Sequence, residues 1–156
     1  MKFSAQEEYG IRCLIRIGIH YDKGESPTIS QISTEEEISQ HNVAKLLRVL
    51  RLGGLLESAR GHSGGYTLAK APEDIKILEV LDVLGGRLFD DEFCMNHSGE
   101  AIICTHSVDC SVRSLWKVIQ SAVDSVVKNI TLRDLLGKED DLFLKMSDVI
   151  GEKASN

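Results

Sequence analysis

Long hydrophobic runs are missing from this sequence. No apolar stretch approaches the roughly 20 residues that a helix needs to cross a bilayer. The opening MKFSAQEEYG carries acidic side chains where a secretory signal needs its apolar segment. We therefore expect a cytoplasmic protein with no membrane partner. In a reducing compartment, clustered cysteines are more often metal ligands or reactive groups than disulfide partners.

Proline is scarce, and the common motifs of enzymes are absent. The chain has 2 prolines in 156 residues and is 42% hydrophobic and 27% charged, which is typical of an ordered globular protein. This length suits one compact domain, or a small domain with an extra long helix. There is no Walker or dinucleotide-binding glycine motif, and no cysteine has an obvious set of base and orienting groups. The sequence therefore does not predict an enzyme.

Basic residues are concentrated in one segment of an acidic chain. The net charge is −6, but residues 39–70 carry five basic and one acidic side chain, whereas residues 1–38 sum to −3 and residues 71–156 to −7. Phosphate binding depends on where Lys and Arg lie rather than on the total charge. The basic segment is therefore a candidate DNA-binding region.

Three helices are predicted before residue 53. Ser4 and Glu7 have the spacing of a capping box, and apolar residues at helical spacing continue to Tyr21. A short helix over TISQISTEEEIS is followed by a basic, amphipathic helix after Ser39, which is its candidate N-cap. Two short helices joined by a tight turn, the second one basic, are typical of a helix-turn-helix.

The second of these helices is the candidate recognition helix. Its N-terminal polar residues are expected at base edges, and its basic residues and the following turn at phosphates. The predicted DNA-binding residues are Ser39, Gln40, His41, Asn42, Lys45, Arg48, Arg60 and His62. A basic helix face is often merely solvated, but the adjacent hairpin favours DNA contact.

That hairpin is predicted from LLESARGHSGGYTLA, where two β-prone runs flank a glycine-rich turn. It would form the wing of a winged helix. The predicted fold is therefore mainly α with a small β-hairpin wing: a winged helix-turn-helix joined to a long dimerisation helix.

The rest of the chain divides into a helix, a loop, a long helix and a tail. Pro72 is predicted to open a helix that ends at Gly85, with Ile75, Leu78, Leu81 and Val83 or Leu84 buried. A periodic helix over residues 111–130 has an apolar stripe too large for its neighbours to cover, which predicts a dimer helix. The predicted units are a DNA-binding domain (1–85), a cysteine loop (86–110), a dimerisation helix with a short capped helix (111–137) and a flexible tail (138–156).

Three of the four cysteines, Cys94, Cys104 and Cys110, lie in FCMNHSGEAIICTHSVDC. Thiolates suit iron–sulfur clusters, and three cysteines with one oxygen or nitrogen donor complete a ligand set. A structural zinc site that also uses His97 has an acceptable ligand set as well. Cys13 lies near the apolar stripe of the first helix and is predicted to be a small buried hydrophobe.

Four segments together resemble the IscR/NsrR family of bacterial winged-helix regulators that carry iron–sulfur clusters. They are MKFSAQEEYGIRCLIRIG, SQHNVAKLLRVLRLGGLLES, ARGHSGGYTLA and DCSVRSLWKVIQSAVDSVVKNITLRDLL. The resemblance covers residues 1 to about 137. It implies a homodimer with crossed long helices, a 2Fe–2S or 4Fe–4S cluster near the DNA-binding domain, and transcriptional control, usually repression, that responds to iron, redox state or nitric oxide.

The fourth ligand departs from part of the family. Some members place a histidine three residues after the last cysteine, and here that position is Arg113. Another subgroup uses an acidic residue in the first helix of the partner subunit, and that position matches Glu8. The resemblance therefore implies the ligand set Cys94, Cys104, Cys110 and Glu8, with His97 and His106 as competitors.

The predicted function is an iron–sulfur-dependent transcriptional repressor that binds a palindromic double-stranded operator as a homodimer. Cluster ligands would come from both chains. The alternative is a zinc-stabilised winged-helix protein that acts as a structural or partner-docking module.

Overall fold

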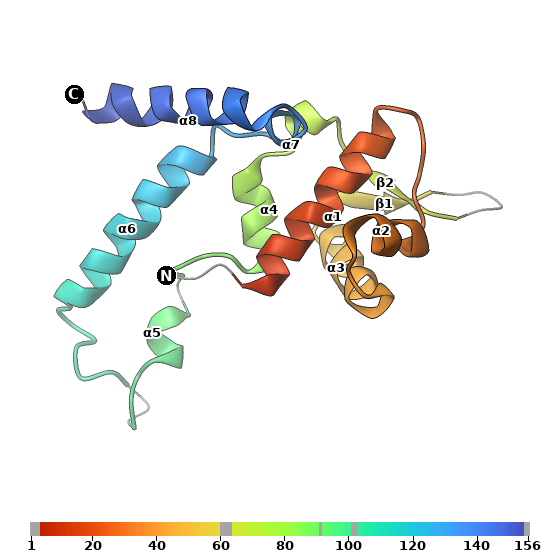
Figure 1. Ribbon diagram of the computed structural model, residues 1–156. Coiled ribbons are helices and arrows are strands. Elements are labelled where there is room, and N and C mark those ends of the chain that lie inside the picture. Colours follow the sequence, from red (N-terminus) through yellow and green to blue (C-terminus); the bar gives the residue numbers. More distant parts are fainter. Residues whose placement is uncertain (1–3, 60–63, 91, 101–102, 155–156) are drawn as a thin grey trace.

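The structure is a computed structural model that describes residues 4–59, 64–90, 92–100 and 103–154. It is mostly helical, with one small antiparallel sheet, so the predicted fold class is confirmed. Helices α1 to α4 and the two strands lie together on one side of the molecule, and α6 extends away from them on the other side (Figure 1). Their bounds are α1 Ala5–Tyr21, α2 Ile29–Glu36, α3 Gln40–Leu52, β1 Leu56–Ser58, β2 Tyr66–Leu68, η1 Pro72–Asp74, α4 Ile77–Leu84, α5 Phe93–Asn96, α6 Ser111–Val127, α7 Leu132–Leu135 and α8 Glu139–Ala154.

Helix α1 begins directly after its predicted capping residue, Ser4. The Ser4 backbone N–H donates to the Glu7 carboxylate, which is the predicted capping box. Cys13, Leu14 and Ile17 have no exposed surface and pack into the core with α3 and α4. This apolar face fixes α1 as the scaffold on which the helix-turn-helix is built.

Helices α2 and α3 form the predicted helix-turn-helix. Thr28 caps α2 through the Gln31 amide, and Ser39 caps α3 through the Asn42 amide. Glu37, between the helices, has a left-handed backbone with φ of 55°. The buried face of α3 consists of Val43, Leu46, Leu47 and Leu50, as predicted.

The wing is attached to the linker before α2. Strands β1 and β2 pair antiparallel, with Leu56 opposite Leu68. The Tyr66 amide donates to the Pro27 carbonyl at 3.0 Å. A Cβ added at Gly65, where φ is 141°, would lie 2.3 Å from the Ser26 carbonyl oxygen, so this close approach requires glycine.

The predicted helix from Pro72 is wrong in its first half. A short 3-10 turn precedes Ile75, and α4 begins only at Ile77. The backbone between them pairs with a distant segment, since the Ile77 amide donates to the Ile130 carbonyl and the Leu132 amide to the Ile75 carbonyl. Helical bonding is therefore interrupted there. Ile75, Leu81 and Leu84 are buried as predicted, but Leu78 is only half-buried, and Ile77 and Val80 complete the buried face of α4 instead.

The C-terminal half also differs from the prediction. Where the sequence predicts a frayed tail after Lys138, the structure contains α8, which begins with three acidic residues that favour a helix N-terminus. The division of the chain into functional units stays a prediction. Within the described residues, no helix combines the length and apolar character that a bilayer crossing requires.

Candidate DNA-binding and metal-binding sites

The predicted recognition residues lie on the first turns of α3 and its N-cap. Ser39, Gln40, His41, Asn42, Lys45 and Arg48 are all exposed. Ser39 Oγ accepts from the Asn42 amide at 3.4 Å, and Gln40 Nε2 donates to Ser30 Oγ at 3.4 Å. The structure therefore brings six of the eight predicted residues together. Arg60 and His62 lie outside the described residues.

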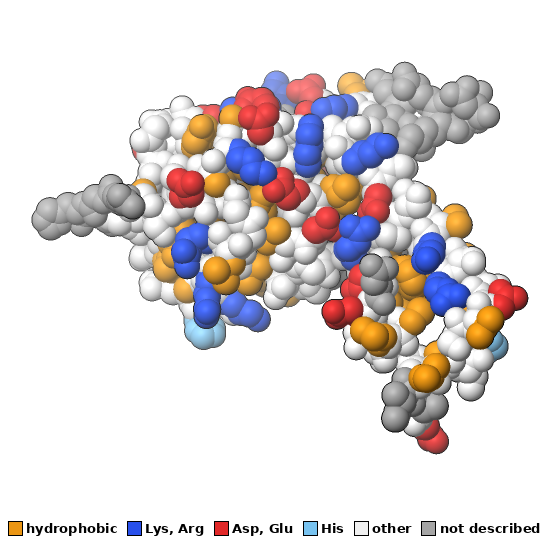
Figure 2. Space-filling model, turned by 180° about the vertical axis from the view of Figure 1, so that it is seen from behind, with side chains coloured by type: hydrophobic (Ala, Val, Ile, Leu, Met, Phe, Trp, Pro, Cys, Tyr) orange, Lys and Arg blue, Asp and Glu red, His pale blue; other side chains and the backbone are white. Residues whose placement is uncertain are grey.

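The basic side chains of α3 lack acidic partners. Lys45, Arg48 and Arg51 make no ion pair with any residue that the structure describes, whereas Lys70 and Arg87 do. Figure 2 shows Lys and Arg side chains gathered at the lower left, beside a histidine, where α3 lies when Figure 1 is turned. Charges that are not neutralised within the chain remain available to phosphates.

Arg51 is a further candidate for phosphate contact that is not in the predicted set. It is exposed, three residues after Arg48, and lines a groove with the wing residues Leu56, Glu57 and Thr67. Its spacing was the available signal, because residues three apart share a helix face.

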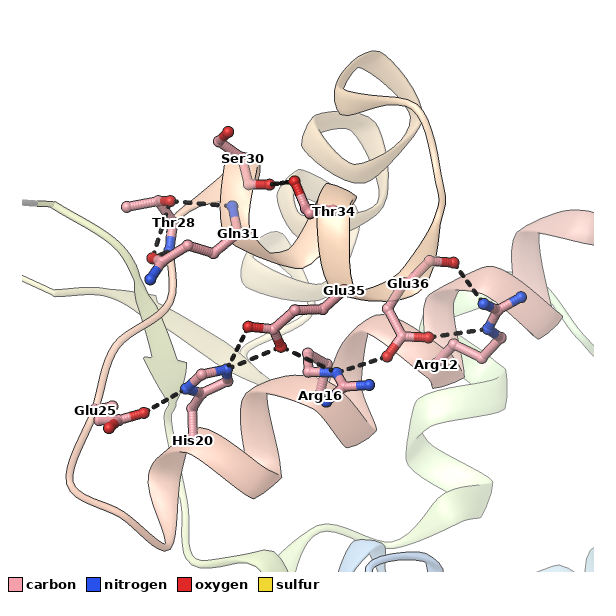
Figure 3. A network of polar contacts seen from close by, with 10 residues as sticks. All are labelled: Arg12, Arg16, His20, Glu25, Thr28, Ser30, Gln31, Thr34, Glu35 and Glu36. Carbon is pink, nitrogen blue, oxygen red and sulfur yellow. Dashed lines mark hydrogen bonds and ion pairs between the residues drawn. The ribbon is translucent and has the colours of Figure 1, made fainter.

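A polar network fixes α2 against α1 (Figure 3). Arg12 Nε donates to the Glu36 carboxylate at 3.1 Å, and its Nη2 donates to the Glu36 carbonyl at 2.6 Å. Arg16 Nε donates to the other Glu36 oxygen at 2.7 Å and lies 3.3 Å from Glu35. Glu36 is only 9% exposed, so these cations compensate a nearly buried charge.

His20 continues this network at the end of α1. Its Nδ1 lies 2.6 Å from a Glu25 oxygen, and its Nε2 lies 3.1 Å from a Glu35 oxygen. Burial alone would lower the pKa of His20, but the hydrogen bonds to Glu35 and Glu25 outweigh it and raise the pKa above its ordinary value. With a carboxylate at each nitrogen, only the protonated ring can donate to both.

The three loop cysteines line the same two cavities. Cys94 lies on α5, Cys104 in the loop, and Cys110 at the start of α6. All three are free thiols of intermediate exposure. Each lines a cavity of about 300 Å³ and a neighbouring cavity of about 210 Å³. The fold therefore gathers thiols that are up to 16 positions apart in the chain.

Aromatic side chains form one wall of the smaller cavity. Phe93 stacks on His97 with ring centroids 4.2 Å apart and lies 6.5 Å from the Trp116 ring. His97 Nδ1 also lies 2.8 Å from the Phe93 carbonyl oxygen. Trp116 therefore packs against the loop, and His97 Nε2 makes no hydrogen bond with the residues that the structure describes.

Cys110 also has a structural task. Its Sγ accepts from the Arg113 amide at 3.3 Å and so caps α6. Arg113 occupies the position of the family's histidine, and its guanidinium donates to the Ser107 carbonyl at 3.3 Å. Cys13, in contrast, is fully buried, and burial raises the pKa of its thiol to about 11, so it stays a neutral core residue.

The loop fits an iron–sulfur cluster in the chemistry of its donors. Three thiols around a partly open, mainly apolar cavity are ligands of the kind that such clusters use. Among the described residues, however, no three His, Cys, Asp or Glu side chains are arranged to hold a metal ion. Glu8 is exposed near the start of α1 and does not line either cysteine cavity. In a single chain, Glu8 therefore does not lie at the site that the three cysteines form.

Sequence comparisons place these features among known regulators. Residues 3–138 match the family described as Rrf2, iron-dependent transcriptional regulator. The HTH-type transcriptional regulator NsrR of Halalkalibacterium halodurans is 31% identical over 142 residues, which cover 91% of this chain and 94% of that protein. The HTH-type transcriptional regulator IscR of Serratia proteamaculans is 27% identical over 90% of this chain and 82% of that protein.

Two solved structures of transcriptional regulators are similar to this chain in both fold and sequence. T. potens IscR is 30% identical, with a TM-score of 0.66 over 87% of this chain and 86% of that chain. CymR, described as the global cysteine regulator of B. subtilis, is 27% identical, with a TM-score of 0.63 over 87% of this chain and 96% of that chain. The family match spans the winged helix, the cysteine loop and α6 together.

Proposed function

The chain belongs to the Rrf2 family of transcriptional regulators, and from this premise we propose that it is a repressor whose DNA affinity depends on an iron–sulfur cluster. The observation that carries the proposal is the gathering of Cys94, Cys104 and Cys110 around one partly open cavity beside α6. The same chain presents the basic face of α3, whose Lys and Arg side chains make no ion pair with the residues that the structure describes. The proposed signals are redox state, nitric oxide or iron–sulfur status.

The DNA-binding part of the proposal rests on α3 and the wing. Gln40 and Asn42 can make paired hydrogen bonds with adenine, and Lys45 and Arg48 suit phosphates. All four are exposed near the start of α3. The proposed target is a palindromic operator, because a two-fold dimer presents two recognition helices to half-sites about one helical turn apart.

The proposed homodimer rests on the apolar face of α6. Val112, Leu115 and Val118 are 56%, 54% and 67% exposed in the single chain. Figure 1 shows α6 standing apart from the winged helix along most of its length. A second α6 packed on this face would remove these side chains from water, at roughly 25 cal/mol for each Å² of apolar surface buried.

Cys94, Cys104 and Cys110 would hold the cluster, and Glu8 of the partner subunit is the proposed fourth ligand. Glu8 is exposed, and its side chain makes no hydrogen bond or ion pair with the described part of its own chain that would have to break first. When bound, a cluster supplies thiolate-ligated iron that responds to oxidants and to iron supply. His97 and His106 are the alternative donors, since both line the smaller cavity.

Loss of the cluster would change how α5 packs against the start of α6. Cys110 is tied to the first turn of α6 by the Arg113 amide, whereas Cys94 lies on the separate helix α5. Drawing their sulfur atoms together brings α5 against the start of the dimer helix. Loss of the cluster would release the sulfur atoms and free the loop. The bound and released arrangements of the loop would then favour different positions of the two winged helices in the dimer.

Purification without oxygen tests the cluster. We expect a coloured protein with visible thiolate-to-iron absorption, bleached by air or nitric oxide, and stoichiometric iron and sulfide. Cys104→Ala should be colourless. A colourless wild-type protein with one zinc per chain would refute the proposal and favour the zinc-stabilised module.

Substitution of Glu8 tests the fourth ligand separately. Glu8→Ala should alter the spectrum and shorten the lifetime of the cluster in air, whereas Glu57→Ala, an equivalent change at another exposed acidic residue, should not. If the Glu8 variant keeps the wild-type spectrum and lifetime, Glu8 leaves the ligand set and the histidines are tested next.

A further inference from the structure

The most buried side chain of α6 is polar. Among the described residues of this helix, only Gln120 is buried, at 7% exposed, while the apolar side chains around it are half-buried or exposed. A buried amide group is costly unless its hydrogen bonds are satisfied. Gln120 therefore has a specific set of partners, and these partners show what it holds.

Gln120 holds the start of the cysteine loop. Its Oε1 accepts from the Leu88 amide at 2.7 Å and from the Phe89 amide at 3.1 Å. Its Nε2 donates to Asp124 Oδ1, one helical turn later, at 2.7 Å. Both hydrogen-bonding ends of the side chain are therefore used, and its orientation is fixed.

Asp124 extends this contact to the winged helix. Arg87 Nη2 donates to Asp124 Oδ2 at 2.8 Å, and Arg87 Nη1 donates to Asp82 Oδ1 in α4 at 2.6 Å. We call Arg87, Gln120 and Asp124 the loop anchor. It joins α6, the first residues of the loop and α4, which packs against α1 and α3.

We propose that Gln120 is the positioning residue that couples the cysteine loop to the DNA-binding domain, by holding Leu88 and Phe89 on α6. The inference rests on the proposed function. Phe89 lies next to Phe93, with ring centroids 5.3 Å apart, and lines the smaller cysteine cavity. A change in the loop therefore reaches the backbone that Gln120 binds. With the anchor intact, this change moves α4 relative to α6; without it, residues 87–89 absorb the change locally.

Gln120→Met is the decisive variant, because it removes all three hydrogen bonds at similar volume. Ser121→Ala is the matched control, since Ser121 is the next residue on α6 and is exposed. Full-length protein is purified without oxygen, and operator affinity is measured before and after cluster removal. Hydrogen exchange of the Leu88 and Phe89 amides is followed in the cluster-free form.

For wild type and Ser121→Ala we expect the two affinities to differ at least about fivefold, the lower end of typical allosteric couplings. For Gln120→Met the ratio should fall below about twofold, with an unchanged visible spectrum and faster exchange at both amides. If Gln120→Met perturbs folding, Arg87→Gln is the second variant to test. Arg87 lies at the exposed rim of the anchor, and its substitution should also reduce the ratio of the two affinities.

Four results would overturn the inference. A wild-type ratio in Gln120→Met, or unaltered exchange at Leu88 and Phe89, would remove Gln120 from the coupling and leave the proposed function standing. Wild-type protein without a cluster, or with equal affinities in both forms, would overturn the proposed function and the inference together.

Discussion

Replacing His20 by Gln should destabilise the protein at acidic and neutral pH and have a smaller effect at alkaline pH. The His20 ring joins the end of α1 to Glu25 in the linker and to Glu35 in α2. Only the imidazolium donates to both carboxylates, because a neutral ring has a single N–H. The stabilisation therefore depends on the protonation of one ring.

The expected size follows from how exposed the two contacts are. A hydrogen bond to a charged group contributes about 1.5–3 kcal/mol when protected from water, and exposed ion pairs contribute about 0–1 kcal/mol. The His20 side chain is 11% exposed, but Glu35 is 33% and Glu25 is 55% exposed. We therefore expect about 1–2 kcal/mol in total, most of it from Glu35.

The sign of the pH dependence is fixed by the raised pKa of His20 in the folded state. The stabilisation is fully present below the unfolded-state pKa, about 6.5, and is lost as pH rises through the higher folded-state pKa. Urea unfolding from pH 5.5 to 9 should show the difference in unfolding free energy between wild type and His20→Gln shrinking as pH rises.

His41→Gln is the control, because His41 is exposed on α3 and makes no ion pair with any described acidic residue. Its unfolding free energy should follow that of wild type at every pH. A His20 effect that is independent of pH, or that grows with pH, would refute the argument from the doubly bonded imidazolium.

Three further predictions concern packing, DNA and the start of α6. Gly10→Ala should cost about 1–3 kcal/mol in thermal or urea unfolding, because its Cβ would lie 2.6 Å from a leucine methyl of α4; Gly151→Ala, in open space on α8, should be neutral or stabilising. Arg48→Ala should lower the log–log salt slope of operator binding by about one, whereas Lys70→Ala, whose ammonium already binds a carboxylate, should leave the slope unchanged. In the cluster-free protein, Cys110→Ala should speed amide exchange in the first turn of α6, whereas Cys110→Ser, which keeps a capping atom, should not; equal exchange in the two variants would refute the cap.

The parts of the fold that sequence predicted well depend on local signals. Ser4 and Ser39 each cap the helix that the sequence places after them, because a cap is satisfied within the next three residues. The wing follows from glycines between two β-prone runs. The recognition surface gathers for the same reason, since its members lie on neighbouring turns of one helix.

The parts that sequence missed depend on distant partners. Residues 75–77 leave the helical pattern because their backbone pairs with residues 130–132, which no local spacing reveals. Gln120 looks like one polar residue on an apolar helix until the Leu88 and Phe89 amides are seen beside it. The ligand set is of the same kind, because Glu8 and the cysteines meet, as proposed, only across two subunits.

The attachment of the wing to the Ser26–Pro27 linker limits where regulation can act. This hydrogen bond and the close contact at Gly65 link the base of the hairpin to the chain entering α2, so the wing and the helix-turn-helix are expected to move as one unit. In the proposed homodimer, a signal would then act mainly on the separation and tilt of the two units. The effect of the signal on operator binding should therefore depend on the spacing of the half-sites, while the sequence of each half-site is read in the same way in both states.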